Sequence, residues 1–154
     1  MKKFFIIFLL AGLIFSCAST GKNADSIADF TLISGQDWKL TEVRINGIRT
    51  EFNRDNMDVG FREFFTVKFD DENVGGRGAP NTYSAPYILM SNQEVHILPM
   101  RSTLMAALRE PDELKEHDFF TYLQNTYAWE ATGRNLTLLA KNDEGREVKL
   151  IFSK

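Results

Sequence analysis

The segment Gly75–Tyr87 reads G-G-R-G-A-P-N-T-Y-S-A-P-Y and lies near the middle of the 154-residue chain, between strand-like segments. Glycine within a strand pattern marks a bulge or the close approach of another backbone segment. We therefore expect two strands, Val74–Gly78 and Thr82–Met90, that meet at a crowded join. A second short run, Arg101–Ala107, reads R-S-T-L-M-A-A. Neither run is an active site by itself.

Two segments before the join alternate apolar and polar residues, which is typical of half-buried strands. They are Trp38–Ile45 and Phe65–Phe69. The alternation slips at Thr41-Glu42, which predicts a β-bulge, and Asn46-Gly47 is a strong turn signal. We expect the polar segment Thr50–Gly60 to be a loop.

One principal helix is expected late in the chain. Asp112 has the residue type of an N-cap and acidic residues follow it, so the helix is predicted to run from Asp112 to near Asn125. Phe119, Phe120 and Leu123 fall on one side of a helical wheel and form the predicted buried stripe of this helix.

The remaining segments after the join predict a helical turn at Ser102–Leu108 and four strands, at Glu94–Pro99, Tyr127–Thr132, Leu136–Lys141 and Arg146–Phe152. Strands joined by hairpin turns imply an antiparallel sheet, and a lone helix must cover one face of it or plug one end. The predicted fold is therefore α+β, a small antiparallel barrel-like sheet of about eight strands with one principal helix.

The N-terminus has the pattern of a secretory signal peptide. Two lysines are followed by the apolar run Phe4–Phe15 and by a small residue, Ser16, so residues 1–16 are predicted to be removed on export. The apolar run is too short for a membrane-spanning helix, which needs about 20 residues.

Cys17 is the only cysteine in the chain, so it cannot form an internal disulfide. Because Ile14–Cys17 resembles a bacterial lipobox, we expect Cys17 to be lipidated; the alternative is ordinary secretion with a free or intermolecular thiol. Residues 17–29 would then be the lipidated cysteine and a flexible polar tether, and residues 30–154 the domain. Ala18 after the cysteine carries no inner-membrane retention signal under the common enterobacterial rule, so the expected location is the outer membrane.

The charge of the chain argues against nucleic acid as a partner. Removal of Lys2 and Lys3 with the signal peptide leaves 16 basic and 21 acidic residues, a formal charge of −5. Such a surface does not attract nucleic acid or anionic lipid by charge. Attachment to the membrane is therefore expected through the lipid on Cys17.

The chain resembles the META domain family, which includes the HslJ-type heat-shock lipoproteins. The resemblance covers roughly residues 35–152 and depends on several short motifs in order rather than on any one of them. The matching residues are Trp38 and Leu40, then Asn81, Tyr83 and Tyr87, then Ser102, Thr103, Met105 and Ala106, then Phe119 and Leu123.

The resemblance implies a small antiparallel barrel-like α+β fold and a poorly defined biochemical activity, associated with stress tolerance and envelope integrity. This chain departs from the family where two family cysteines are replaced by Pro80 and Ala107. Thiol chemistry at those positions is therefore excluded.

No pattern in the sequence predicts a catalytic or metal site, and no cofactor is expected. A calcium site at the acidic turn Asp70–Asn73 would need further oxygen ligands at loop spacing, which are absent. The glycines of the join lack the pattern of a phosphate-binding loop. His96 and His117 stand apart, without the spacing of a zinc site or a nucleophile beside them.

The polar residues most worth following lie at and after the join. Asn81 is expected to satisfy nearby backbone groups, with Thr103 in the same cluster; the alternative is a ligand contact. Tyr83 and Tyr87 share one strand face, either as core packing or as the wall of a ligand site.

Two functional classes remain open. The first is a lipid-anchored, non-enzymatic envelope protein that binds or stabilises an envelope partner. The second is a carrier of a small hydrophobic ligand or lipid inside the barrel. An enzyme is a distant third, because no nucleophile with an adjacent base is recognisable.

Overall fold

The structure is a computed structural model that describes residues 30–154. The predicted signal peptide, Cys17 and the tether lie outside these residues, so the expectations about them stay predictions. Among the described residues, no helix is both long enough and apolar enough to cross a membrane.

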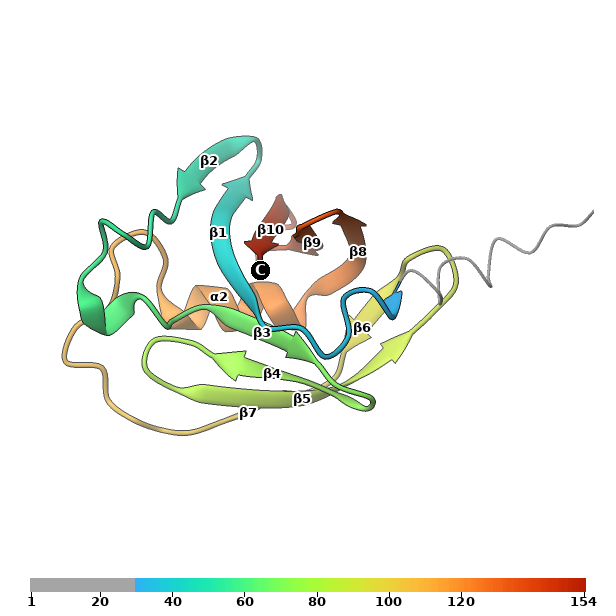
Figure 1. Ribbon diagram of the computed structural model, residues 1–154, viewed down its shortest axis with the longest axis horizontal. Helices are drawn as coiled ribbons and strands as arrows, with labels where there is room; N and C mark the ends of the chain where they lie inside the picture. Colours follow the sequence, from blue (N-terminus) through green and yellow to red (C-terminus); the bar gives the residue numbers. More distant parts are fainter. Residues whose placement is uncertain (1–29) are drawn as a thin grey trace, which may run out of the picture.

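Within residues 30–154 the named strands form one antiparallel sheet, accompanied by one α-helix, α2 (Glu116–Gln124), and one 3-10 turn, η1 (Val59–Phe61) (Figure 1). The strands are β1 (Trp38–Ile45), β2 (Ile48–Glu51), β3 (Thr66–Phe69), β4 (Asn73–Arg77), β5 (Thr82–Leu89), β6 (Val95–Ile97), β7 (Arg101–Ser102), β8 (Thr126–Thr132), β9 (Asn135–Lys141) and β10 (Glu147–Ser153). Eight of them follow the order β6-β5-β4-β3-β1-β10-β9-β8, while β2 pairs with β1 and β7 with β5. The predicted fold class is confirmed.

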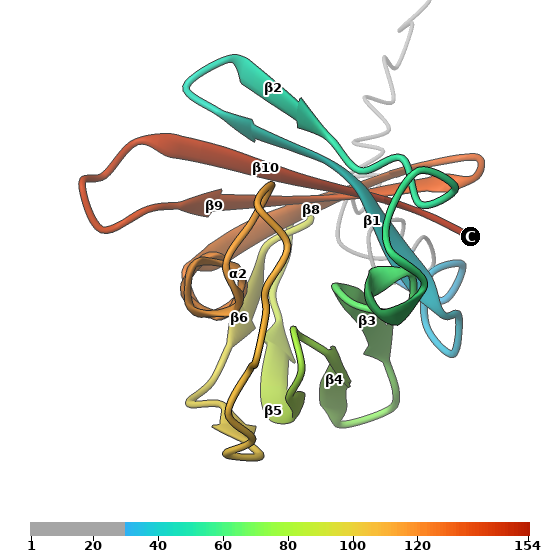
Figure 2. The same ribbon diagram turned by 90° about the vertical axis from the view of Figure 1, so that its left-hand side faces the viewer.

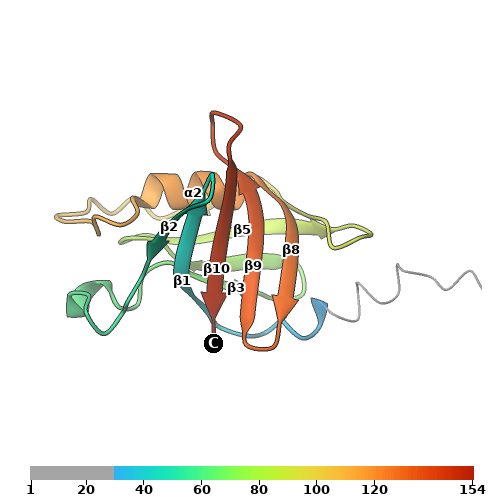
Figure 3. The same ribbon diagram turned by 90° about the horizontal axis from the view of Figure 1, so that it is seen from above.

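Strand β1 joins the two halves of the barrel. Its first residues, Trp38 and Lys39, pair with β3, whereas Glu42–Ile45 pair with β2. The register against β10 shifts between Leu40 and Glu42, which is the bulge that the sequence predicted. The bulge bends the strand, so that β1, β10, β9 and β8 cross over the layer that contains β3 and β5 (Figure 3).

The barrel closes only in part between β6 and β8. One bridge, Glu94 to Ala128, and a hydrogen bond from the Trp129 N–H to the Gln93 carbonyl at 2.9 Å connect these segments. Helix α2 packs against β9 and β6 and lies between the two layers of the sheet (Figure 2). The helix therefore plugs the incomplete side of the barrel.

Apolar side chains fill the space between the layers and the helix. Phe119 and Leu123 of α2 are fully buried, as the predicted stripe requires, and Phe120 is half-buried. The Phe119 ring lies 5.1 Å from Phe65 and 6.0 Å from Tyr83, in edge-to-face arrangements. The largest fully buried side chains come from both layers and the helix: Trp38, Trp129, Phe65, Phe69, Phe119, Phe152, Ile33, Leu40, Leu123, Leu136, Leu138 and Leu150.

The prediction of a helical turn at Ser102–Leu108 is wrong. Arg101 and Ser102 instead pair with β5 as β7, and the segment after them contains no helix. The Thr103 N–H donates to the Thr82 carbonyl at 3.1 Å, so edge pairing with β5 holds the chain extended.

The predicted start of the helix at Asp112 is also wrong. The helix begins at Glu116 with Lys115 in the N-cap position and no side-chain cap. Pro111 and Leu114 are buried, so packing on the core, rather than capping, decides the path of the chain before the helix.

The loop predicted at Thr50–Gly60 begins later than expected. The Asn46-Gly47 turn, with φ of 50° and 84°, brings Ile48–Glu51 back along β1 as β2. Loop structure starts after Glu51 and includes η1.

Candidate functional site

The side chain of Asn81 joins β5, the segment after β7 and helix α2. Its Oδ1 accepts hydrogen bonds from the Thr103 hydroxyl and from the Met105 N–H, both at 2.7 Å. Its Nδ2 donates to Glu116 Oε2 at 2.6 Å and to the Met105 carbonyl at 3.2 Å. Asn81 is buried, and these four contacts use both donors and both acceptor positions of its amide.

Glu116 is the second centre of this cluster, although its sequence position predicted only an acidic residue near the start of a helix. Its Oε1 accepts from the backbone N–H of Asn81 at 2.7 Å and from that of Ala79. Glu116 precedes Phe119 and Phe120 by three and four residues, which places it on the buried face of the helix. A carboxylate on the buried face of a predicted helix was the one sequence feature that could have indicated this role.

The glycines of the join allow this close approach. A Cβ on Gly78 would lie 2.5 Å from Glu116 Oε1 and 2.7 Å from the Phe120 ring. A Cβ on Gly76 would collide with the Thr66 carbonyl. The crowded join predicted from the sequence is therefore present, and its glycines leave no spare room for a ligand.

Tyr83 and Tyr87 both direct their hydroxyls to strand β3 or the turn after it. The Tyr83 hydroxyl donates to the Thr66 carbonyl at 2.8 Å, and burial raises the pKa of Tyr83. The Tyr87 hydroxyl donates to the Asp70 carbonyl at 2.7 Å. Partial burial, with smaller contributions from Asp71 and Asp70, raises the pKa of Tyr87. Both side chains tie β5 to β3 rather than lining a hollow.

The structure thus brings together Asn81 and Thr103 but leaves Tyr83 and Tyr87 outside their hydrogen-bond network. Thr103 is exposed, yet its hydroxyl donates to Asn81 and accepts from the Thr82 N–H at 3.2 Å. Because the polar groups of Asn81 are already paired, the cluster offers a substrate no free group from that side chain. The hydrogen bonds of the cluster connect the join to α2 and to the segment after β7.

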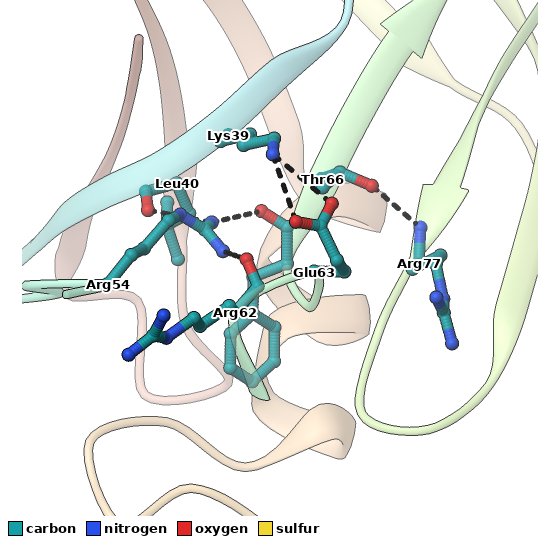
Figure 4. Close-up of polar contacts among 8 residues, drawn as sticks. Lys39, Leu40, Arg54, Arg62, Glu63, Thr66 and Arg77 are labelled. Atoms are coloured by element: carbon teal, nitrogen blue, oxygen red, sulfur yellow. Dashed lines mark hydrogen bonds and ion pairs between the residues drawn. The ribbon is translucent and has the colours of Figure 1, made fainter. Parts of the chain in front are cut away.

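A second polar cluster surrounds Arg54, at the point where β1 leaves β3 (Figure 4). The Arg54 guanidinium donates to the carbonyls of Leu40, at 3.0 Å, of Phe65, at 3.4 Å, and of Arg62. Burial lowers the pKa of Arg54, and the charge of Glu63 partly offsets this effect. No sequence pattern predicted this cluster, which caps backbone carbonyls at the bend of β1.

A third cluster holds the β1–β2 hairpin. The carboxylate of Glu42 is buried and paired with Arg44 and Arg49. Burial opposes ionisation, but the hydrogen bonds from the two arginines outweigh it, so the pKa of Glu42 lies below its usual range.

The described residues include no group of three or more potential metal ligands, and His96 and His117 are both exposed. Open hollows of about 160 to 480 Å³ lie beside loops and hairpins. The sequence-predicted residues Asn81, Tyr83, Tyr87 and Thr103 do not line these hollows.

Comparisons with known proteins agree with this fold. The sequence profile of the META domain matches residues 30–151. A protein from Burkholderia xenovorans, known from NMR, has a similar structure with a TM-score of 0.57 at 15% identity, covering 99% of this chain and 97% of that chain. A DUF4847 family protein from Bacteroides vulgatus is similar with a TM-score of 0.52 at 12% identity, covering 80% of this chain and 94% of that one. No curated protein matches the chain.

Proposed function

Because the chain belongs to the META domain family, we propose that it is a lipid-anchored envelope protein whose domain binds or stabilises another envelope protein. In this proposal Cys17 carries the lipid and residues 17–29 form the tether. The domain acts through its surface and performs no catalysis.

The filled interior is the observation that carries this proposal. Fully buried side chains from both layers and from α2 occupy the space where a carrier would hold its ligand. Protein interiors packed in this way leave few voids larger than a water molecule. Partner binding at the surface is therefore favoured over transport of an apolar ligand.

The polar clusters favour the same conclusion. Asn81 and Glu116 hold one another and the backbone of the join, and Arg54 holds backbone carbonyls. A catalytic group needs a donor or acceptor that can turn toward a substrate. The side chain of Asn81 has no unpaired donor or acceptor, because all four positions are hydrogen-bonded.

Crosslinking in intact cells tests the partner. Full-length protein with a C-terminal tag would be crosslinked, purified and compared with Cys17→Ser, which keeps the domain but lacks the anchor. We expect one envelope protein to be enriched with the wild type and less with Cys17→Ser, and only the wild type to incorporate labelled palmitate. Equal labelling of the two would refute the anchor.

Native mass spectrometry of residues 18–154 tests the carrier alternative. We expect the bare mass of the chain. A lipid that remains bound in stoichiometric amount would contradict the proposal and favour a carrier.

A further inference from the structure

Four large apolar side chains are exposed on two neighbouring loops at one end of the barrel. Leu104 and Leu108 are 97% and 105% exposed, and Met105 and Val59 are 52% and 79% exposed. Leu104 and Met105 belong to the second run, Arg101–Ala107, and Leu108 follows it directly. Exposed apolar groups gathered in one region commonly mark a site of interaction.

The two loops are connected to each other. Arg109 forms an ion pair with Asp58 at 2.7 Å and lies 5.6 Å from the centre of the Phe61 ring. Val59 follows Asp58 and Leu108 precedes Arg109, so both exposed apolar residues are next in sequence to this contact. Figure 2 looks onto this end of the molecule, with η1 and the chain that leads to α2 in front.

The same loops are held by the polar clusters. The Asn81 amide binds both the N–H and the carbonyl of Met105. Arg62 donates to the carbonyls of Met57 and Asp55, and Arg54 donates to that of Arg62. The apolar side chains are thus presented on loops that are already fixed, which reduces the entropy lost on binding.

Carboxylates lie beside the Asp58–Arg109 contact that joins the two loops. Beside the Asp58–Arg109 pair lies a hollow of about 160 Å³ with Met57 and Phe61 among its lining residues. Its other lining residues are Asn56, Asp58, Arg109, Glu110, Pro111, Asp112 and Glu113. Asp112 and Glu113 are exposed; Asp112 pairs with Lys115 at 3.7 Å on the surface, whereas Glu113 has no ion-pair partner among residues 30–154. The surface therefore combines an apolar centre with an acidic rim.

This end lies away from the point where the described chain begins. In Figure 1 the described chain begins on the right, in blue, while η1 and the loop before α2 are on the left. Attachment through residues 17–29 would therefore leave these loops uncovered.

We propose that Val59, Leu104, Met105 and Leu108, with the rim of Asp58, Glu110, Asp112 and Glu113, form a docking surface for a basic amphipathic segment of an envelope protein. Its apolar residues would cover the leucines, and its lysines or arginines would meet the carboxylates. Arg109 of the chain itself already makes both kinds of contact here, an ion pair with Asp58 and a cation–π contact with Phe61. This inference rests on the proposed function and names the partner's chemistry.

Site-specific photocrosslinking in intact cells tests the surface. A photoreactive residue would replace Val59 in the full-length protein, and Ile48 on β2, which is 75% exposed, would be the matched control position. We expect crosslinks from position 59 to an envelope protein, at a peptide with net positive charge and apolar residues three or four apart. Crosslinks mainly to a second copy of the chain, to lipid, or to an acidic peptide would overturn the proposal.

Two variants sharpen the result. Leu104→Ser with Leu108→Ser, and separately Asp112→Lys with Glu113→Lys, should each reduce the crosslink from position 59 at least tenfold. The melting temperature should stay unchanged, because these side chains are exposed. An undiminished crosslink in both variants would overturn the proposal. If the partner crosslinks only from position 48, the surface is wrong but the proposed function stands; if no position yields an envelope protein, both fail.

Discussion

Asn81 and Glu116 hydrogen-bond each other, and each also binds a different part of the backbone. Glu116 accepts hydrogen bonds from backbone N–H groups of the join. Asn81 accepts one from the Met105 N–H, in the segment after β7, and donates one to Glu116. A buried polar group that loses its partner destabilises a protein by about 1–3 kcal/mol. Single substitutions at this pair should therefore act on stability.

At the residue scale, we expect Asn81→Ala to lower the melting temperature by at least roughly 3 °C, since each kcal/mol corresponds to about 3–6 °C for a domain of this size. Asn81→Asp should lower it further, because a second carboxylate would face Glu116 Oε2, which lies 2.6 Å from Asn81 Nδ2. Thermal unfolding followed by circular dichroism measures both.

Asn73→Ala on β4 is the matched control, because Asn73 is an exposed asparagine on a neighbouring strand. It should leave the melting temperature within about 1 °C, as surface substitutions usually do. An Asn81→Ala protein with the melting curve of the wild type would show that the cluster does not support the fold.

The sequence singled out Asn81 and Thr103, because an asparagine after a glycine-rich join usually satisfies backbone groups. It did not reveal the role of Glu116, since that role depends on where α2 docks. Arg54 was missed for the same reason: its acceptors, the carbonyls of Leu40, Arg62 and Phe65, come from separate parts of the chain. A local sequence pattern does not predict hydrogen bonds between segments that come together only in the folded domain.

At the scale of elements, α2 can reach the join only because Gly78 has no side chain. Gly78→Ala should destabilise the domain by about 1–3 kcal/mol, the usual effect of overpacking a tight contact. Chemical denaturation should show this as a lower midpoint with an unchanged slope.

Gly60→Ala tests whether alanine as such is responsible. A Cβ on Gly60 meets nothing within 4 Å, and its φ is not in the left-handed region. The replacement should be neutral or slightly stabilising, by about 0.4–1 kcal/mol. Equal effects of the two replacements would contradict the close packing at Gly78.

Glu42 in the β1–β2 hairpin should make the free energy of unfolding depend on pH. The pKa of Glu42 is lower in the folded state, so its contribution is present above the unfolded pKa of about 4.3 and is lost as the pH falls through the folded value. We expect Glu42→Gln to be less stable than the wild type at pH 7, with a difference that shrinks below about pH 4. Urea unfolding between pH 7 and 3 measures this difference.

Glu130→Gln on β8 is the control, because Glu130 is exposed and has no ion-pair partner among residues 30–154. If the Glu42→Gln difference instead stayed constant down to pH 3, the ion pairs with Arg44 and Arg49 would not govern the pKa.

The strands were predictable because their alternation of buried and exposed residues is local, and the bulge in β1 appeared as a slip in that alternation. The start of α2 and the path of residues 103–115 were not, because burial of Pro111 and Leu114 and pairing with β5 override the local signals.

At the scale of the whole molecule, the domain begins before its first strand. Phe30 and Ile33 are buried, and the Phe30 ring lies 5.1 Å from Trp129 and 5.3 Å from Phe69. The Trp38 indole N–H also donates to the Ile33 carbonyl at 2.9 Å. Phe30 therefore connects the two layers of the sheet.

Fragments 30–154 and 18–154 should have the same melting temperature, because the tether is expected to contribute little apolar surface. A fragment 38–154 should be less stable by at least about 3–5 kcal/mol, the typical effect of emptying one buried aromatic site. Differential scanning calorimetry compares the three. Equal melting of fragments 38–154 and 30–154 would show that residues 30–37 are dispensable.

The pairing of β1 with β10 has a consequence for how the chain acquires its fold. Thr41 donates to the carbonyl of Ile151, 110 residues later, and β10 separates β1 from β9 and β8. Contacts between such distant residues form slowly, because a long loop must close before they stabilise anything. On this side β1 has no partner until β10 has been synthesised, so the barrel can be completed only when almost all of the described domain has been made.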